Sequence, residues 1–235
     1  MSTGFRMPAE WEPHLATWMQ FPTGNFTFGP SGSDSLERYQ RAWADVANAI
    51  AVFEPVLMVC HPDDVFAAQD MLGEGVELLI DTIDDAWCRD SGPTFVVDEG
   101  GRLGAVDWRF NAWGNGEYLS FENDARIGGV IARASGAVVL ESSMVNEGGG
   151  IHVDGEGTVL VTETVQLDPG RNPGWSKEQV ETELRRWADT FENAAFGITV
   201  TDATTNTIAF ANPARAAMCG RTVEEVCGSY VFDDY

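Results

Sequence analysis

The sequence is poor in basic residues. Its 235 residues include 14 Lys and Arg against 37 Asp and Glu, a formal net charge of −23 at pH 7. Such a surface repels phosphate backbones, which argues against a nucleic-acid partner. The simpler interpretation of this charge is a very soluble or salt-adapted surface. Attraction of small cations is the alternative.

Long apolar runs and a signal-peptide pattern are also missing. The longest apolar runs are too short to span a bilayer, so no membrane partner is expected. The start MSTGFRMPAE has no basic stretch followed by an apolar one. We therefore expect a cytoplasmic protein.

Cysteine and histidine are few and scattered. Their spacing gives neither a CxxC motif nor a zinc pattern, so no metal site is predicted, and reduced thiols are expected. The residues concerned are Cys60, Cys88, Cys219, Cys227, His14, His61 and His152.

The first part of the chain alternates helices and strands. Residues 34–53 predict a helix, with Asp34 and Glu37 at capping-box spacing. The apolar run 55–60 predicts a buried strand, 62–73 a second helix, and 76–81 another strand. The expected buried face of the first helix consists of Leu36, Tyr39, Trp43, Val46, Ala47 and Ile50.

A repeated order then follows. Residues 94–108 predict a hairpin, 122–136 a helix, 137–141 a strand and 150–163 a second hairpin. The order helix, strand, hairpin thus occurs twice, in residues 62–109 and 122–164. Two copies indicate an α/β fold built from ββαβ units.

The pattern changes again near residues 187–191. Beyond this boundary we expect a hairpin with Ile198 and Val200 on one arm and Ile208 and Phe210 on the other. Two short helices follow, one beginning at Asn212-Pro213 and one capped by Thr222 and Glu225. The predicted domains are residues 1–187 and 188–235.

The stretch IDDAWCRDSGPT combines residues that neither a surface turn nor a core strand needs. Three carboxylates, a guanidinium, a thiol and a tryptophan stand directly before a Ser-Gly-Pro turn. Three further blocks are as specific: PAEWEPH followed by TWM, then WRFNAWG, and NEGGGIHVDGEGT.

These four blocks, in this order over residues 7–186, resemble the agmatine deiminase family of the pentein superfamily. The resemblance implies a five-bladed α/β propeller of ββαβ units and no metal or organic cofactor. It implies hydrolysis of the agmatine guanidinium to N-carbamoylputrescine and ammonia, a step toward putrescine and other polyamines. A cysteine thiolate attacks, carboxylates hold the guanidinium, and a histidine moves protons.

The resemblance and the side-chain chemistry assign roles to individual residues. Asp90 matches the catalytic carboxylate that grips the guanidinium, because a planar cation is best held by bidentate carboxylates. Trp87 is expected to wall the pocket and stack on the cation. Glu147, before three glycines, is a second substrate contact, and Trp18 is expected at the cleft mouth. Arg89 is expected to orient Asp84 or Asp85.

Cys88 and His152 are of residue types that often act in catalysis, but they are assigned no catalytic role here. If residues 87–90 are a strand, Cys88 shares a face with Asp90, but nearby carboxylates raise its pKa and suppress the thiolate. The family's nucleophile lies in a later glycine-rich block. His152 precedes a hairpin turn at Asp154, so we interpret it as structural or as supporting the site indirectly; His14 is interpreted as packing.

The resemblance ends near Trp187. The family's Gly-His-x-Asp block and terminal cysteine block do not occur in these 235 residues, so the nucleophile is unassigned and the chain alone is expected to be inactive. Residues 191–235 resemble the beginning of a PAS domain. Two other functions therefore remain open: a non-catalytic sensory or interaction protein, possible as a homo-oligomer, and a peptidyl-arginine deiminase.

Overall fold

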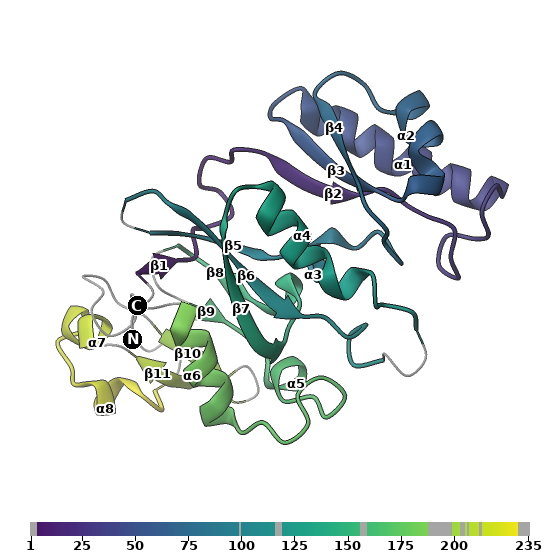
Figure 1. Ribbon diagram of the computed structural model, residues 1–235. Helices are drawn as coiled ribbons and strands as arrows, with labels where there is room; N and C mark the ends of the chain where they lie inside the picture. Colours follow the sequence, from purple (N-terminus) through teal and green to yellow (C-terminus); the bar gives the residue numbers. More distant parts are fainter. Residues whose placement is uncertain are drawn as a thin grey trace.

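The computed structural model describes residues 4–98, 100–115, 119–155, 159–187, 199–202, 205, 207–211 and 213–229. Its first layer is a parallel three-stranded sheet in the order β2-β3-β4, with helices α1 and α2 packed on it (Figure 1). Val56, Met58, Val59 and Cys60 of β3 are buried and Leu57 is half-buried, in agreement with the buried strand predicted at 55–60. The elements are β2 (Thr17–Gln20), α1 (Asp34–Ala51), β3 (Val56–Cys60), η1 (Pro62–Asp64), α2 (Val65–Met71) and β4 (Val76–Ile80).

Helix α1 begins at Asp34 as expected and ends at Ala51, two residues before the predicted end, but its N-cap and its buried face differ from the prediction. The N-cap is Ser33, whose Oγ accepts a hydrogen bond from the Leu36 amide at 3.2 Å, so the predicted capping box at Asp34 and Glu37 is wrong. Leu36 and Ala47 are buried as expected. Tyr39 and Val46 are exposed, and the buried face instead contains Ala44, which joins the core cluster of β3, and Gln40, which bonds Pro22 O and Asp64.

The second sheet has the order β1-β5-β6-β7. Strands β5 and β6 form the predicted hairpin, and β7 pairs in parallel with β6 after the crossover helix α4. Residues of β5 alternate between faces: Phe95 packs toward α4, whereas Val96 joins the core on the other side. The elements are β1 (Phe5–Arg6), α3 (Cys88–Ser91), β5 (Thr94–Asp98), β6 (Leu103–Arg109), η2 (Asp124–Arg126), α4 (Ile127–Ala134) and β7 (Val138–Val145).

The second hairpin and helix α6 cover the other face of this sheet. Their apolar residues join the main core cluster, in which Trp108 and Met144 are buried beside Val153 and Val180. The elements are η3 (Gly148–Gly150), β8 (His152–Val153), β9 (Val159–Leu160), α5 (Glu163–Gln166) and α6 (Lys177–Trp187).

The predicted repeat is confirmed as an order of elements. A helix, a strand and a hairpin occur as α2, β4 and β5–β6, and again as α4, β7 and β8–β9. The run β5-β6-α4-β7 is one ββαβ unit held in a single sheet. The fold is therefore mixed α/β, with two sheets that meet through an apolar cluster containing Val59, Ile83, Ile127 and Ile131.

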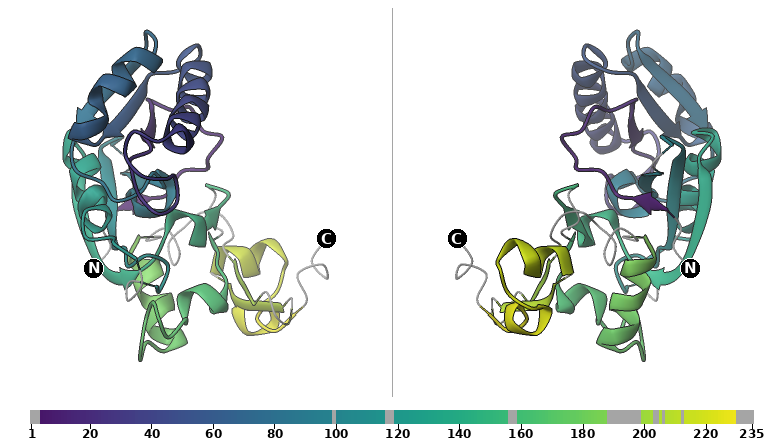
Figure 2. Two further views of the ribbon diagram at one scale, coloured as in Figure 1. Left: turned by 90° about the vertical axis from the view of Figure 1, so that its right-hand side faces the viewer. Right: turned by 90° about the vertical axis from the view of Figure 1, so that its left-hand side faces the viewer.

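The C-terminal elements form a small core of their own at one end of the molecule (Figure 2). Thr222 and Glu225 make the predicted capping box, and Gly220 and Gly228 follow the two helices with positive φ. Ile198 and Asn212 lie outside the described residues. The elements are β10 (Thr199–Asp202), β11 (Thr207–Ala211), α7 (Pro213–Met218) and α8 (Val223–Val226).

Within the described ranges, the helices are too short or too polar to cross a bilayer. The same residues contain no group of three or more His, Cys, Asp or Glu side chains arranged to hold a metal ion.

Candidate active site

The segment from Trp87 to Ser91 is a helical turn, α3, and the strand expected there is wrong. The Ser91 amide donates to Trp87 O at 3.0 Å, and the Gly92 amide donates to Cys88 O at 2.9 Å. Side chains two positions apart in a helix point in nearly opposite directions. Cys88 therefore packs into the apolar cluster between the sheets, while Asp90 points away from it.

Asp90 lies where α3, the turn at Trp113 and the glycine turn η3 meet. The Trp113 side chain lies near the Asp90 carboxylate and favours its ionised form. A Cβ added to Gly149 would lie 3.5 Å from Asp90 Oδ1, so η3 passes directly beside the carboxylate. Burial raises the pKa of Asp90, and Trp113 and the nearby Arg89 charge partly oppose that rise.

Glu147 enters the same region from the other side of η3. It is 3% exposed, and the Arg171 guanidinium Nε donates to its two oxygens at 2.9 and 3.3 Å. Burial raises the pKa of Glu147; Arg171 opposes this rise, and the Asp90 charge adds to it. Because burial raises the pKa of both Asp90 and Glu147, a cation placed beside them would favour the ionised form of each.

Gly148 permits this approach of η3 to α3. A Cβ at this position would lie 2.4 Å from Arg89 O, a distance that no side chain tolerates. The glycine run that marks Glu147 in the sequence therefore has a local cause: it lets the backbone of η3 lie against the turn that carries Asp90.

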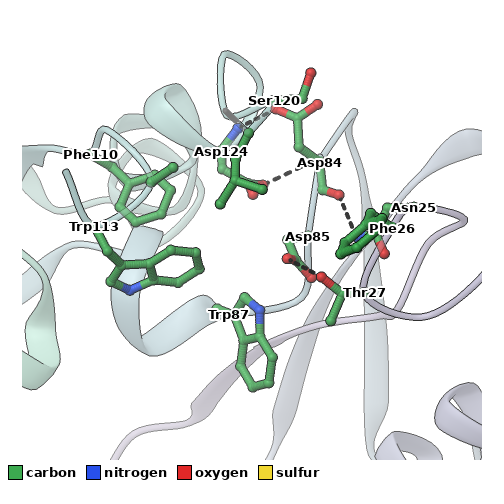
Figure 3. A pocket seen from close by; sticks show the side chains of 12 residues that line it. Asn25, Phe26, Thr27, Asp84, Asp85, Trp87, Phe110, Trp113, Ser120 and Asp124 are labelled. Atoms are coloured by element: carbon green, nitrogen blue, oxygen red, sulfur yellow. Dashed lines mark hydrogen bonds between the residues drawn. The ribbon is translucent and has the colours of Figure 1, made fainter. Parts of the chain in front are cut away.

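A pocket of about 390 Å³ lies beside α3; Trp87 lines it, whereas Asp90 and Glu147 are not among its lining residues. Figure 3 shows Phe110 and Trp113 on one side and Asp84, Asp85 and Thr27 on the other, with Trp87 below them. The Trp87 ring is also 5.8 Å from that of Trp43. Aromatic faces beside carboxylates are the surroundings that organic cations prefer.

Asp84 and Asp85 are held by loops, and the prediction that Arg89 orients them is wrong. The Asp84 carboxylate accepts hydrogen bonds from the Asn123 amide at 2.7 Å and from Asn123 Nδ2 at 2.9 Å. Asp85 accepts one from Thr27 Oγ1 at 3.2 Å. Arg89 instead forms an ion pair with Glu10, which fastens the opening block of the sequence to α3.

Asp124 is a pocket residue that the sequence analysis missed. It is 3% exposed, and its Oδ1 accepts hydrogen bonds from the Asp84 amide at 3.0 Å and from Gln20 Nε2 at 3.3 Å. Burial, with added repulsion from Asp84 and Asp85, raises its pKa to about 7. Its sequence setting, ENDAR, resembles any exposed helix start, so no local pattern marks it.

Trp113 is a second missed residue, although it lies in a block that carries the resemblance. Ala112 and Trp113 both have positive φ, 54° and 58°, which non-glycine residues rarely adopt. Asn111 closes this turn by accepting the Gly114 amide at 2.9 Å. Backbone strain of this kind is common at functional sites, and here the strained residues Ala112 and Trp113 both line the pocket.

Trp18 and His152 lie away from the pocket. Trp18, on β2, packs against the apolar cluster between the sheets rather than at a cleft mouth. His152 is exposed on β8, where it pairs with Leu160 across the hairpin and lies near Glu10. His14 is exposed, and its ring nitrogens bond Glu10 O at 2.7 Å and Glu54 at 3.3 Å.

Cys88 should resist alkylation in the folded chain. Burial, with the charges of Asp124 and Asp90, raises the pKa of its thiol to about 12, so almost no thiolate exists at pH 8. Iodoacetamide at pH 8, followed by peptide mass mapping, should leave Cys88 unmodified until a denaturant is added. Rapid modification of Cys88 in the native chain would contradict this account and restore it as a candidate nucleophile.

Comparisons with known proteins agree with this geometry. A Streptomyces avermitilis protein that carries the provisional name agmatine deiminase is 55% identical over 181 residues, covering 77% of this chain and 52% of the relative. An agmatine deiminase of Pseudomonas aeruginosa is 42% identical over 187 residues, covering 77% and 50%. The solved agmatine deiminase of Enterococcus faecalis superposes with a TM-score of 0.74 at 35% identity, covering 79% and 51%.

The chain thus spans about half the length of the relatives it matches. The model of the Porphyromonas-type peptidyl-arginine deiminase family matches residues 6–217, which include α3, η3 and the pocket. By this match, the chain belongs to the Porphyromonas-type peptidyl-arginine deiminase family.

Proposed function

We propose that this chain carries the guanidinium-holding part of an agmatine deiminase. The observation that supports this most is that Asp90 and Glu147 both lie at the contact of α3 and η3, where burial raises the pKa of each carboxyl group and the Asp90 charge adds to the rise at Glu147. A guanidinium has donors on two edges, and two carboxylates that converge on one point can accept from both.

The site would bind the substrate by placing a cation beside two carboxyl groups that burial disfavours in their ionised form. Burial raises the pKa of both Asp90 and Glu147, and a bound cation would oppose that rise. Trp113 and Trp87 line the neighbouring pocket, where Trp87 would offer a flat face for the guanidinium plane. The acidic wall of Asp84 and Asp85 would favour a substrate whose far end is also a cation, as in agmatine.

Agmatine is the preferred substrate over peptidyl-arginine. The relatives that are 42–55% identical are named agmatine deiminases. The carboxylates that line the pocket would attract the charged amine of agmatine, whereas the peptide backbone beside a peptidyl-arginine is neutral and gains no such attraction. No metal or organic cofactor is part of this proposal.

The same proposal covers the architecture. The ββαβ unit β5-β6-α4-β7 would be one blade of a pentein-type propeller. The elements β10, β11, α7 and α8, with their separate small core, would be the start of a PAS-like module beyond a boundary near residue 188. A PAS-like module would add a sensory or dimerising role, and a dimerising module would make the chain a homo-oligomer.

Ligand competition tests the substrate class. Isothermal titration at pH 7.5 should give a lower Kd for agmatine than for putrescine, which lacks the guanidinium, and than for N-acetylarginine amide, which mimics peptidyl-arginine. Equal affinity for agmatine and putrescine would mean that the amine alone is recognised and that Asp90 and Glu147 hold no guanidinium. Tighter binding of N-acetylarginine amide would favour the peptide substrate.

Turnover is expected to be absent in the 235-residue chain. Its sequence contains neither the Gly-His-x-Asp block nor the cysteine block of the family, and burial raises the pKa of Cys88 to about 12. Assays for ammonia and N-carbamoylputrescine should therefore stay at background while agmatine still binds. Product formation that disappears in Asp90→Asn would reveal a nucleophile within this chain.

A further inference from the structure

The side chain of Gln20 ties together three segments around the proposed site. Gln20 is the last residue of β2 and is fully buried. Its Oε1 accepts from Ser91 Oγ at 2.7 Å, and its Nε2 donates to Asp85 O at 2.9 Å and to Asp124 Oδ1 at 3.3 Å. Both donors and the acceptor of this carboxamide are therefore used.

These bonds hold both ends of the segment that carries Trp87 and Asp90. Asp85 precedes Trp87, and Ser91 follows Asp90. Ser91 Oγ also lies 3.2 Å from Trp87 O, so the hydroxyl links the end of α3 back to its start. A four-residue helix has too few internal hydrogen bonds to be stable alone, and its position must come from outside contacts.

From this geometry we infer that Gln20 is a positioning residue for substrate binding. It acts through Asp85 and Ser91, and it sets where α3 presents Asp90 and Trp87. The inference rests on the proposed function for its ligand, agmatine. No pattern in the stretch TWMQFP distinguishes Gln20 from a surface residue at a strand end.

A second buried glutamine provides a matched control. Gln40, in α1, is 4% exposed, and its Nε2 donates to Pro22 O at 3.0 Å and to Asp64 Oδ1 at 2.9 Å. Gln20→Met and Gln40→Met both remove a buried carboxamide with little change in volume. Both should lower stability to a similar degree, because each leaves buried polar partners without a hydrogen bond.

The experiment measures the Kd for agmatine and the hydrogen exchange of residues 85–92 in both variants. Gln20→Met should weaken binding about tenfold, which corresponds to about 1.4 kcal/mol of binding free energy, because Asp90 and Trp87 are no longer held in position. It should also speed exchange in that segment. Gln40→Met should change neither. Wild-type affinity and unchanged exchange in Gln20→Met would overturn the inference.

Ser91→Ala covers the case in which Gln20→Met does not fold. It removes the hydroxyl that bonds Gln20 Oε1 and leaves Gln20 in place, and it should also weaken binding and speed exchange; unchanged values would overturn the inference. If the wild-type chain does not bind agmatine, the proposed function fails. The exchange of residues 85–92 then still decides whether Gln20 positions α3.

Discussion

Replacing Arg171 by methionine should lower the free energy of unfolding by about 3–5 kcal/mol at pH 7, because it leaves Glu147 buried and unpaired. Both side chains of this ion pair are largely buried, at 15% exposure for Arg171 and 4% for Glu147. The variant should also raise the pKa of Glu147 further, since Arg171 is the main influence that opposes burial there. Urea unfolding followed by circular dichroism gives the measurement.

Two further variants test whether the loss of stability in Arg171→Met comes from the unpaired charge of Glu147. Arg171→Met combined with Glu147→Gln should recover much of the loss, because the buried charge is gone. Lys177→Met removes an ion pair with Glu163 in which both side chains are 45% exposed, and should cost less than about 1 kcal/mol. A loss for Arg171→Met no larger than that for Lys177→Met would show that the Glu147 carboxylate has another partner.

Asp124→Asn should change how stability depends on pH. An aspartate ordinarily titrates near 3.8, and burial raises the pKa of Asp124 to about 7. Between these values the folded chain keeps a proton that the unfolded chain has lost. The contribution of Asp124 to the free energy of unfolding of the wild type therefore falls as pH rises from about 4 to about 7, by at most about 4 kcal/mol.

Asparagine retains the oxygen that accepts from Asp84 and Gln20 but does not titrate. The stability of Asp124→Asn relative to wild type should thus improve between pH 5 and pH 8. Asp98→Asn is the control, because hydrogen bonds from Arg102 lower the pKa of Asp98 and leave it ionised over this range. Parallel profiles for wild type and Asp124→Asn would mean that Asp124 is ionised well below pH 7 in the folded chain.

Local patterns were sufficient to predict most elements and their order. The helix α1, the strands β3 and β4 and both hairpins depend on periodicity, glycine turns and capping residues that act within one segment. The face that α1 buries was not predictable in the same way. It depends on the contacts of Gln40 and Ala44 with other segments, a tertiary choice that overrides the apolar period of Tyr39 and Val46.

In the candidate site, too, some residues could be predicted from local sequence patterns and others could not. The motif blocks identified Asp90, Trp87 and Glu147, whose surroundings the structure now describes. The helical turn α3, the Arg89–Glu10 pair, and the roles of Trp113, Asp124 and Gln20 all depend on contacts between distant segments. Such residues carry no local signal, because a buried carboxylate or carboxamide is recognised only by what surrounds it.

The most direct measurement is isothermal titration of agmatine into the wild-type chain and into Asp90→Asn at pH 7.5. We predict binding of one agmatine per chain and a Kd at least about 30-fold higher for the variant, the loss expected when one partner of a desolvated charged contact is removed. Equal affinity in a folded Asp90→Asn would contradict the account, since the guanidinium would then be held elsewhere.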